Sequence, residues 1–300
     1  MGVGGRTIRI PEAEAMFETI YAQYSRFDGP VATERTMFSS PQEAAVSIKQ
    51  AARDAGADIV GICCIEPSDV YKGREVTQSH AIAVGMRMRY REFQEVPSER
   101  SALECIRVYL ELGETVIQLA RHIRSLGYAC EIEHPLGDSN LLHIPIGIKA
   151  GFGELGRHGS IIHPTLGPLF RMGSVAVTMD LAIDQPVDAG IAAFCDICRS
   201  CRKYCPAGAI PDERETSAQP LPQGQAPYKV DTGRCFPYFA KHNYCSICLP
   251  VCLYNHKEWA RDFEGFQTQK FPSVAMEPSP PPCDVIPEDR RHNYPRLNRG

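Results

Sequence analysis

Eight cysteines between residues 195 and 252 have the spacing of ligands to iron–sulfur clusters. They are Cys195, Cys198, Cys201, Cys205, Cys235, Cys245, Cys248 and Cys252. The first four form the run C-x2-C-x2-C-x3-C and are followed directly by Pro206, a pattern in which the fourth cysteine binds a second, neighbouring cluster. Thiolates at such short spacings can point at the corners of one cubane. The run therefore predicts two [4Fe–4S] clusters.

The two clusters divide these cysteines into two groups of four. We assign one cluster to Cys195, Cys198, Cys201 and Cys252, and the other to Cys205, Cys235, Cys245 and Cys248. The second run differs from the pattern, because nine residues separate Cys235 from Cys245 and Leu253 stands in place of the proline. An inserted loop explains the longer spacing. The remaining cysteines are read as ordinary thiols: Cys63, Cys64, Cys105, Cys130 and Cys283.

Structural zinc and disulfides are the alternative uses of so many cysteines. Zinc sites usually take two separated pairs of ligands, often with histidine, whereas here four cysteines form one run. Disulfides require an oxidising compartment. The N-terminus has neither a hydrophobic signal core nor a twin-arginine pair, so we expect a cytoplasmic protein with reduced thiols.

The chain is longer than two clusters require. Its 300 residues are 43% hydrophobic, which is enough to bury a sizeable core. We expect a larger domain over residues 1–190, a cluster domain over 191–262 and a proline-rich, irregular tail over 263–300. The net charge of −4 gives no footprint for a polyanionic partner, and no apolar run reaches the length of a membrane span.

Periodicity predicts helices that alternate with short strands before residue 190. Helices are expected at 41–55, 99–126, 141–148 and 253–263, and buried strands at 57–64, 80–86, 128–133, 160–163 and 171–181. This order favours a layered α/β core. Tyr109 lies on the apolar stripe of the long helix, so its ring points inward; a hydroxyl bonded to a backbone carbonyl is the structural reading. Gly113, one turn later, leaves space for another group.

Four glycines follow the short helix, namely Gly151, Gly153, Gly156 and Gly159. The first three match G-x-G-x-x-G, but the dinucleotide fingerprint needs a strand before it and a helix after it. Here that order is reversed, so we reject a dinucleotide site. Four glycines so close together still indicate that the backbone approaches something closely, either another segment of the chain or a large ligand.

Residues 144–160 and 165–173, followed by the cysteine run, resemble the core of the reductive dehalogenases, which are corrinoid iron–sulfur enzymes. The resemblance covers roughly residues 45–260. It implies a nitroreductase-like α/β domain that binds cobalamin, followed by a ferredoxin-like domain with two [4Fe–4S] clusters. The base-on corrinoid motif D-x-H-x-x-G is absent, because Ile132 stands at its first position, so base-off cobalamin is implied.

The resemblance also implies roles for particular residues. Tyr109 falls on the family's proton donor and Arg171 on the basic residue that stabilises the phenolate, which suits a phenol whose ordinary pKa is about 10. Asp138 falls where family members often have an active-site Asn. The implied cofactor contacts are Asp138, Gly151, Gly153, Gly156, Arg157, Gly159 and Met172.

The resulting hypothesis is an oxidoreductase that removes halide from a small organohalide while Tyr109 delivers a proton. No flavin or ferredoxin domain is fused after the clusters, so we expect an external low-potential donor of the ferredoxin or flavodoxin type. One alternative is an enzyme like epoxyqueuosine reductase, which acts on tRNA, uses an Asp as its acid and needs a basic surface. The other alternative is an iron–sulfur electron carrier without a corrinoid or a reaction of its own.

Overall fold

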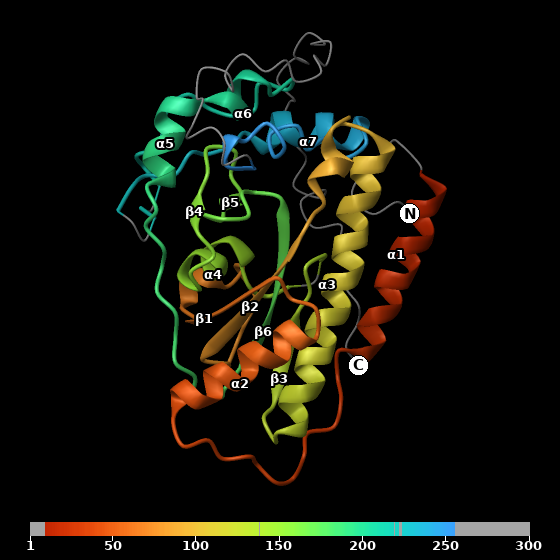
Figure 1. Cartoon of the computed structure of the whole chain (residues 1–300), viewed down its shortest axis with the longest axis vertical. Helices are drawn as coiled ribbons and strands as arrows, with labels where there is room; N and C mark the ends of the chain where they lie inside the picture. The colour runs from red at the N-terminus through yellow and green to blue at the C-terminus, as the bar shows by residue number, and fades with distance from the viewer. Residues whose placement is uncertain (1–9, 138, 219, 222–223, 256–300) are drawn as a thin grey trace.

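The computed structural model describes residues 10–137, 139–218, 220–221 and 224–255. Its centre is a four-stranded antiparallel sheet with the strand order β1-β2-β6-β3 (Figure 1). The strands are β1 (Ile59–Cys64), β2 (His80–Arg87), β3 (Cys130–Glu133) and β6 (Phe170–Val177). The long central pair is in register from His80 opposite Val177 to Arg87 opposite Phe170. All four strands fall within ranges that periodicity predicted or within one residue of them, and the mixed α/β architecture is confirmed.

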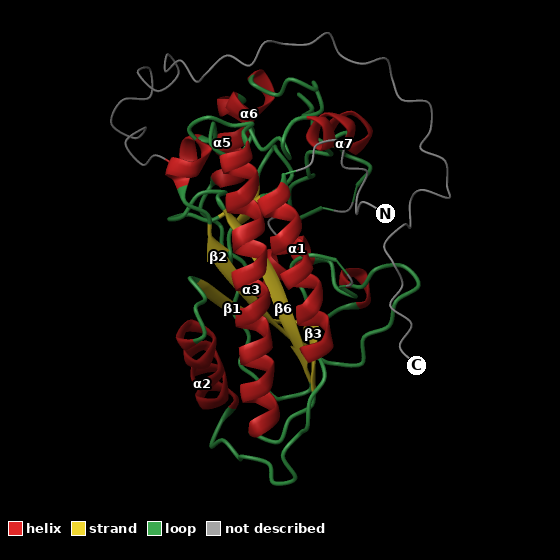
Figure 2. Cartoon of the chain, turned by 90° about the vertical axis from the view of Figure 1, so that its right-hand side faces the viewer, coloured by secondary structure: helices red, strands yellow, loops and turns green. Residues whose placement is uncertain are grey.

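Helices cover both faces of the sheet. The long helix α3 (Glu99–Ser125) and α2 (Pro41–Asp54) pack on one face, and α1 (Pro11–Gln23) packs on the outside of α3 (Figure 2). The short helix α4 (His143–Lys149) packs on the other face. Successive residues of a strand point to opposite faces, so Ile82 and Val84 of β2 face the core beneath α3, whereas Ala81 and Ala83 face α4. Small side chains on the second face allow α4 to approach closely.

Local signals set the ends of the two helices that line the main core. Ser40 caps α2 by accepting a hydrogen bond from the Glu43 amide at 3.2 Å. Gly127 follows α3 with φ of 84°, the left-handed conformation that often ends a helix. Gly113 lies inside α3, where an added Cβ would be 2.3 Å from Gln23 Oε1 and 2.4 Å from His134 Nε2. The space that the sequence indicated at Gly113 is therefore filled by these two side chains.

The helices that follow the sheet and carry Cys195, Cys198, Cys201 and Cys235 lie at one end of the molecule, together with a small hairpin (Figure 1). The hairpin consists of β4 (Glu154–Leu155) and β5 (Ile161–Ile162), and the helices of this end are α5 (Ile191–Cys198), α6 (Ser200–Lys203) and α7 (Thr232–Lys241). Single 3-10 turns occur at Tyr24–Arg26, Pro67–Asp69, Tyr90–Phe93 and Leu253–Asn255. The helix expected over 253–263 is described only as far as residue 255, and the tail over 263–300 lies outside the described residues.

The cysteine-rich end shares the main hydrophobic core. Ile210, Ile247, Leu249 and Val251 are buried in the same cluster as the apolar face of α3. Residues that follow the sheet by more than thirty positions are thus held against the helical layer. Within the described part of the chain, no helix has both the length and the apolar character that crossing a bilayer requires.

Candidate active site

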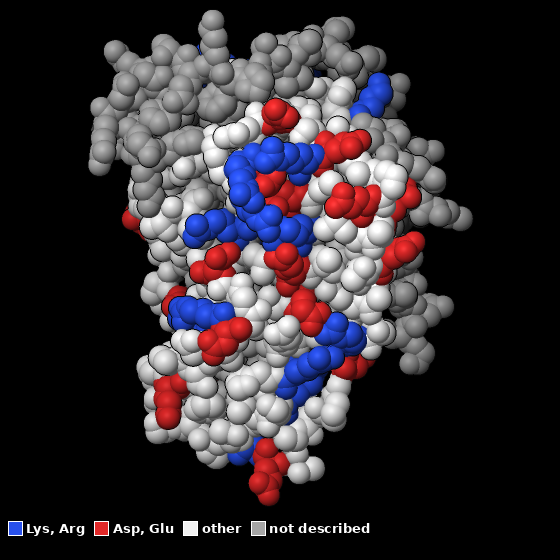
Figure 3. Space-filling view, turned by 45° about the vertical axis from the view of Figure 1, so that its right-hand side comes forward, with Lys and Arg blue, Asp and Glu red and all other residues white. Residues whose placement is uncertain are grey.

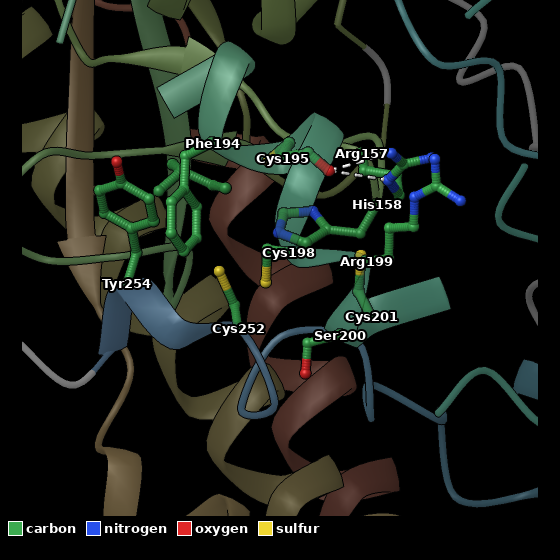
Figure 4. Close-up of a pocket in the computed structure, with 11 residues that line it drawn as sticks. Arg157, His158, Phe194, Cys195, Cys198, Arg199, Ser200, Cys201, Cys252 and Tyr254 are labelled. Atoms are coloured by element: carbon green, nitrogen blue, oxygen red, sulfur yellow. Dashed lines mark hydrogen bonds between the residues drawn. The ribbon is translucent and has the colours of Figure 1, made fainter. Parts of the chain in front are cut away.

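The first group of cysteines surrounds a cavity at the end of α5. Cys195 and Cys198 lie on α5, Cys201 lies on α6, and Cys252 approaches from the last described segment (Figure 4). Arg199, between the two helices, has φ of 53°, so the backbone reverses between Cys198 and Cys201. The cavity has about 290 Å³ of space unoccupied by protein atoms, part of it open to solvent. These are the four cysteines that the spacing assigned to one cluster.

The second group of cysteines lies beside the first. Cys205, Cys235 and Cys245 pack around one small apolar cluster with Tyr238. Cys248 is close enough to the other three for their charges to raise the pKa of its thiol, although burial is the larger cause. Charge on Cys201 of the first group also raises the pKa of Cys248. The two groups are therefore neighbours, as the crossed ligand pattern requires.

Each cysteine group offers the four thiols that one [4Fe–4S] cluster takes as ligands. None of the described cysteines forms a disulfide. The four thiols of the first group line one cavity, so these residues fit such a cluster. The presence of two clusters stays a prediction.

Burial keeps the free thiols protonated. It raises the pKa of Cys195 to about 11 and that of Cys245 to about 12. An iron centre reverses this preference, because a coordinating thiol loses its proton outright. Assembly of clusters on these residues would therefore release protons and replace buried neutral thiols by iron-bound thiolates.

Arg157 fixes the backbone of the first cysteine group. Its side chain is only 1% exposed, and its guanidinium donates to Cys195 O from Nε at 3.1 Å and from Nη2 at 2.9 Å. Nη1 donates to Pro211 O at 2.9 Å and to Asp212 O at 2.7 Å. The Tyr228 hydroxyl accepts a further bond at 2.8 Å, and the guanidinium carbon lies 3.9 Å from the Tyr228 ring centroid. One buried cation thus joins the hairpin to three separate parts of the cysteine segment.

Glu154 fixes the start of α5 from the same hairpin. Its carboxylate is buried and accepts hydrogen bonds from the amides of Ala189 at 2.7 Å, Ile191 at 3.1 Å and Ala192 at 2.9 Å. A negative charge at this position satisfies amides that the first turn of a helix leaves unpaired, and it opposes the helix dipole favourably. Glu154 and Arg157 together hold both ends of the segment that carries Cys195.

The glycine-rich loop makes its close approaches to the protein's own chain. An added Cβ at Gly153 would lie 2.1 Å from Ile162 O, and one at Gly156 would lie 2.6 Å from Ile162 Cδ1. At Gly151 the nearest atom is Gln185 O at 3.0 Å, and at Gly159 it is Val230 Cγ2 at 3.1 Å. Of the two readings of this loop, another chain segment accounts for the glycines. Their assignment as cofactor contacts stays a prediction.

Tyr109 and Arg171 meet at a second pocket. The guanidinium carbon of Arg171 lies 5.2 Å from the centroid of the Tyr109 ring. The pocket that both line has about 540 Å³ of space unoccupied by protein atoms, including its open mouth. Its other lining residues are Pro135, His143, Ile144, Ser160, Ile161, Pro168, Phe170 and Met172. The structure therefore brings together three predicted site residues, Tyr109, Arg171 and Met172, which are far apart in the sequence.

Two residues of α3, Cys105 and Tyr109, lie next to the guanidinium of Arg171. Its Nη2 contacts Cys105 Sγ at 3.2 Å, while its Nε is buried without a partner among the described residues. Burial alone would lower the pKa of Arg171, but the nearby Tyr109 and Cys105 groups raise it above its ordinary value, and Cys248 adds to this effect. The guanidinium thus stays charged between the tyrosine and the second cysteine group. Cys105, one turn before Tyr109 on the same helix face, is a site residue that the sequence reading took for an ordinary thiol.

Two more residues of this region, Asp138 and His134, bear on the sequence analysis. Asp138 lies outside the described residues. His134, which stands in the partial corrinoid motif, is buried and uses its ring within the protein: Nε2 lies 3.1 Å from Gln23 Oε1 and Nδ1 accepts from the Leu136 amide at 3.0 Å. Burial lowers the pKa of His134 to about 4, so the ring is neutral at physiological pH. His134 is therefore a packing histidine in this structure.

Charges of both signs alternate on the face of the molecule shown in Figure 3. Several arginines of the chain are ion-paired, since Arg100 pairs with Glu92, and Arg107 pairs with both Glu104 and Glu111. Positive side chains that are neutralised in this way do not form a continuous phosphate-binding surface.

Comparisons with known proteins show what the chain is similar to. No protein-family model matches the chain. The chain is 30% identical over 223 residues to a tetrachloroethene reductive dehalogenase of Desulfitobacterium hafniense, over 71% of this chain and 40% of that protein. It is 25% identical over 268 residues to a tetrachloroethene reductive dehalogenase of Sulfurospirillum multivorans, over 75% of this chain and 53% of that protein. The chain thus spans about half or less of the length of these relatives.

A solved structure and a second group of enzymes extend the comparison. The catabolic reductive dehalogenase NpRdhA, in complex with 3-bromo-4-hydroxybenzoic acid, superimposes with a TM-score of 0.73 at 25% identity, over 82% of this chain and 37% of that chain. An epoxyqueuosine reductase of Escherichia coli K12 is 34% identical over 178 residues, which is 53% of this chain and 40% of that protein. The structure defines a mixed α/β protein with two neighbouring groups of four cysteines. The chain is similar to the reductive dehalogenases over most of its length, and the predicted resemblance is confirmed.

Proposed function

We propose that this protein carries out the reductive dehalogenation of a small organohalide, using two [4Fe–4S] clusters and a bound corrinoid. The observation that carries the proposal is the meeting of Tyr109 and Arg171 at one pocket, beside the second cysteine group, in a chain related to the reductive dehalogenases. The corrinoid supplies a strongly reducing cobalt centre when it is bound.

The chain has residues suited to holding the clusters and the corrinoid. The two cysteine groups fit the clusters, and Arg157 and Glu154 keep the first of them in place. The pocket at Tyr109 has a partnerless buried atom, Arg171 Nε, which suits a bound group. Residues that line this pocket, such as Ser160 and Met172, would contact the bound corrinoid. Base-off binding is part of this proposal, because His134 is engaged within the protein.

Tyr109 and Arg171 control proton transfer in the proposed reaction. Tyr109 is the proton donor to the carbon that loses halide, and general acid catalysis of this kind contributes roughly 10²–10⁴-fold. Arg171 stabilises the phenolate that remains, because a fixed positive charge beside the ring favours the anion. Ile144, Ile161 and Phe170 give the pocket an apolar lining, which limits competing protonation by water.

The position of Arg171 supports an order of the two clusters along the path of the electrons. Charge on Cys248 contributes to raising the pKa of Arg171, which supports a position of the second cluster next to the catalytic pair. Electrons from an external ferredoxin or flavodoxin would enter through the first cluster and pass to the second. We further propose the division into a nitroreductase-like domain over 1–190 and a ferredoxin-like domain over 191–262, in a cytoplasmic protein.

The test is halide release by protein reconstituted anaerobically with iron, sulfide and cobalamin. Replacing Tyr109 by Phe removes the proton donor while keeping the ring, so we expect halide release to fall by about 10²–10⁴-fold with cluster content unchanged. Tyr71→Phe is the control, because Tyr71 is 49% exposed and does not line the pocket. Full turnover by the Tyr109→Phe protein would overturn the assignment.

A second candidate function is epoxyqueuosine reduction, which the similarity to the Escherichia coli enzyme favours. It would require tRNA binding, yet the net charge is −4 and the face in Figure 3 has paired charges of both signs. Binding of a tRNA anticodon stem loop at moderate salt separates the two functions. An electron carrier without a corrinoid would bind neither tRNA nor cobalamin.

A further inference from the structure

His158 is a buried polar side chain of the first cysteine cavity, and the proposed function assigns it no role. It lies in the turn between β4 and β5, directly after Arg157, and only 7% of the residue is exposed. Its ring lines the cavity together with the four cysteines of the first group (Figure 4). The hairpin that holds the Cys195 backbone through Arg157 therefore also places a histidine among the sulfur atoms.

Contacts within the hairpin fix the tautomer and the position of the His158 ring. The Ser160 amide donates a hydrogen bond to Nδ1 at 3.2 Å. A backbone N–H can only donate, so Nδ1 carries no proton and the proton of the ring is on Nε2. Gly156 leaves room for the ring, because an added Cβ there would lie 3.0 Å from His158 Cε1. The hairpin thus presents Nε2 as a hydrogen-bond donor.

The Nε2 donor of His158 is buried and has no hydrogen-bond partner among the described residues. Such a donor costs free energy that an acceptor inside the cavity would recover. The arginines that line the cavity can only donate, and Ile162 and Phe194 are apolar. The hydroxyl groups of Ser200 and Tyr254 also belong to residues of the lining, but neither is within hydrogen-bond distance of Nε2. A [4Fe–4S] cluster on the four cysteines would bring thiolate and sulfide sulfurs, which are acceptors, into this space.

We propose that the Nε2–H group of His158 donates a hydrogen bond to a sulfur atom of the first cluster and thereby raises the reduction potential of that cluster. Hydrogen bonds to the sulfurs are among the factors that set the potentials of such clusters. Reduction adds one negative charge, and a donor that points at the sulfurs stabilises the more negative state. A higher potential favours the uptake of electrons from the external donor. The inference goes beyond the proposed function, because it concerns the cluster and holds for any substrate.

The test is a redox titration, followed by electron paramagnetic resonance, of protein reconstituted anaerobically with iron, sulfide and cobalamin. Titanium(III) citrate is the reductant, and each cluster takes up one electron as one titanium(III) is oxidised to titanium(IV). Loss of the His158 donor should change the equilibrium constant for reduction of the first cluster by about tenfold, which lowers its potential by about 59 mV. The potential of the second cluster is the internal control and should stay near its wild-type value.

Two matched variants separate the hydrogen-bond donor from the rest of the side chain. His158→Met has no donor and should show the full decrease in potential, whereas His158→Gln keeps an N–H group near the position of Nε2 and should retain most of the wild-type value. Both variants lose the acceptor of the Ser160 amide, so the difference between them isolates the donor. Cys198→Ser replaces a ligand of the first cluster, and the titration step that it shifts or removes belongs to that cluster.

A second measurement detects the hydrogen bond directly in the wild-type protein. Pulsed electron paramagnetic resonance of protein labelled with ¹⁵N-histidine reports any histidine nitrogen that is coupled to a reduced cluster. We expect one such coupling in the wild-type protein and its absence in both His158 variants. This measurement does not depend on whether His158→Met assembles its clusters.

The outcomes distinguish this inference from the proposed function. An unchanged potential in His158→Met with full iron content, equal shifts in His158→Met and His158→Gln, or no histidine coupling in the wild-type protein would each overturn the role of His158. If His158→Met assembles no cluster, the coupling in the wild-type protein decides alone. A donor-dependent shift in a protein that releases no halide would support this inference and overturn the proposed reaction. Halide release together with an unshifted potential would do the opposite.

Discussion

Loss of the Arg157 side chain should destabilise the backbone that carries the first cysteine group. The guanidinium makes hydrogen bonds to the backbone oxygens of Cys195, Pro211 and Asp212 and to the Tyr228 hydroxyl. Hydrogen bonds to charged groups are worth about 1.5–3 kcal/mol each, and shared donors make them less than additive. Arg157→Gln leaves at least two of these buried oxygens unpaired, so we expect a loss of about 3–5 kcal/mol.

Arg202 provides a matched control for this experiment. It contacts the same residue, Asp212, through the carboxylate at 3.1 Å, but both side chains are more than a third exposed. Exposed ion pairs contribute at most about 1 kcal/mol. Chemical denaturation of the reconstituted proteins gives the free energies of unfolding, and iron analysis gives cluster occupancy. If Arg157→Gln kept full iron content and unfolded like Arg202→Gln, the idea that Arg157 positions the cysteine segment would be wrong.

Three further changes test other contacts of the site. Burial lowers the pKa of His134 to about 4 from 6.5. Between these two pH values the unfolded chain binds a proton at His134 that the folded chain does not bind. The free energy of unfolding therefore falls as the pH falls. Lowering the pH from 7.5 to 5 should reduce the free energy of unfolding by about 2 kcal/mol for this group, and His134→Gln should remove that part of the slope in denaturation curves. Cys105→Ala removes the partner of Arg171 Nη2 and should slow halide release by about tenfold, whereas Cys105→Ser should restore most of it. Glu154→Gln should cost about 1–3 kcal/mol at the start of α5, whereas Asp188→Asn, which keeps an oxygen acceptor for its single exposed 3.4 Å bond, should cost less than about 0.5 kcal/mol in the same assay.

Local patterns in the sequence predicted the elements that depend on local signals. Ser40 and Pro41 mark the start of α2, and Gly127 marks the end of α3. The strands were visible as apolar runs because both faces of the sheet are covered by helices. The assignment of the cysteines to two clusters came from their spacing together with the ligand pattern of two-cluster ferredoxins, and it stays a prediction.

Contacts between distant segments could not be read from the sequence. Arg157 reaches Cys195 and Asp212, which lie 38 and 55 residues further along the chain. The glycines near Arg157 indicated a close approach, but only the fold shows that the partners are Ile162 and Gln185. The contact of His143 Nε2 with the backbone oxygen of His134, nine residues away, is likewise not revealed by periodicity.

The most direct measurement of the central claim is electron paramagnetic resonance of the reduced protein, together with iron and sulfide analysis of the same anaerobic sample. Two neighbouring [4Fe–4S] clusters predict about eight irons and eight sulfides per chain and a signal broadened by two interacting spins. The adjacency of Cys201 and Cys248 is the structural reason to expect that interaction. A sample with about four irons and one isolated spin, or with zinc in place of iron, would contradict the account.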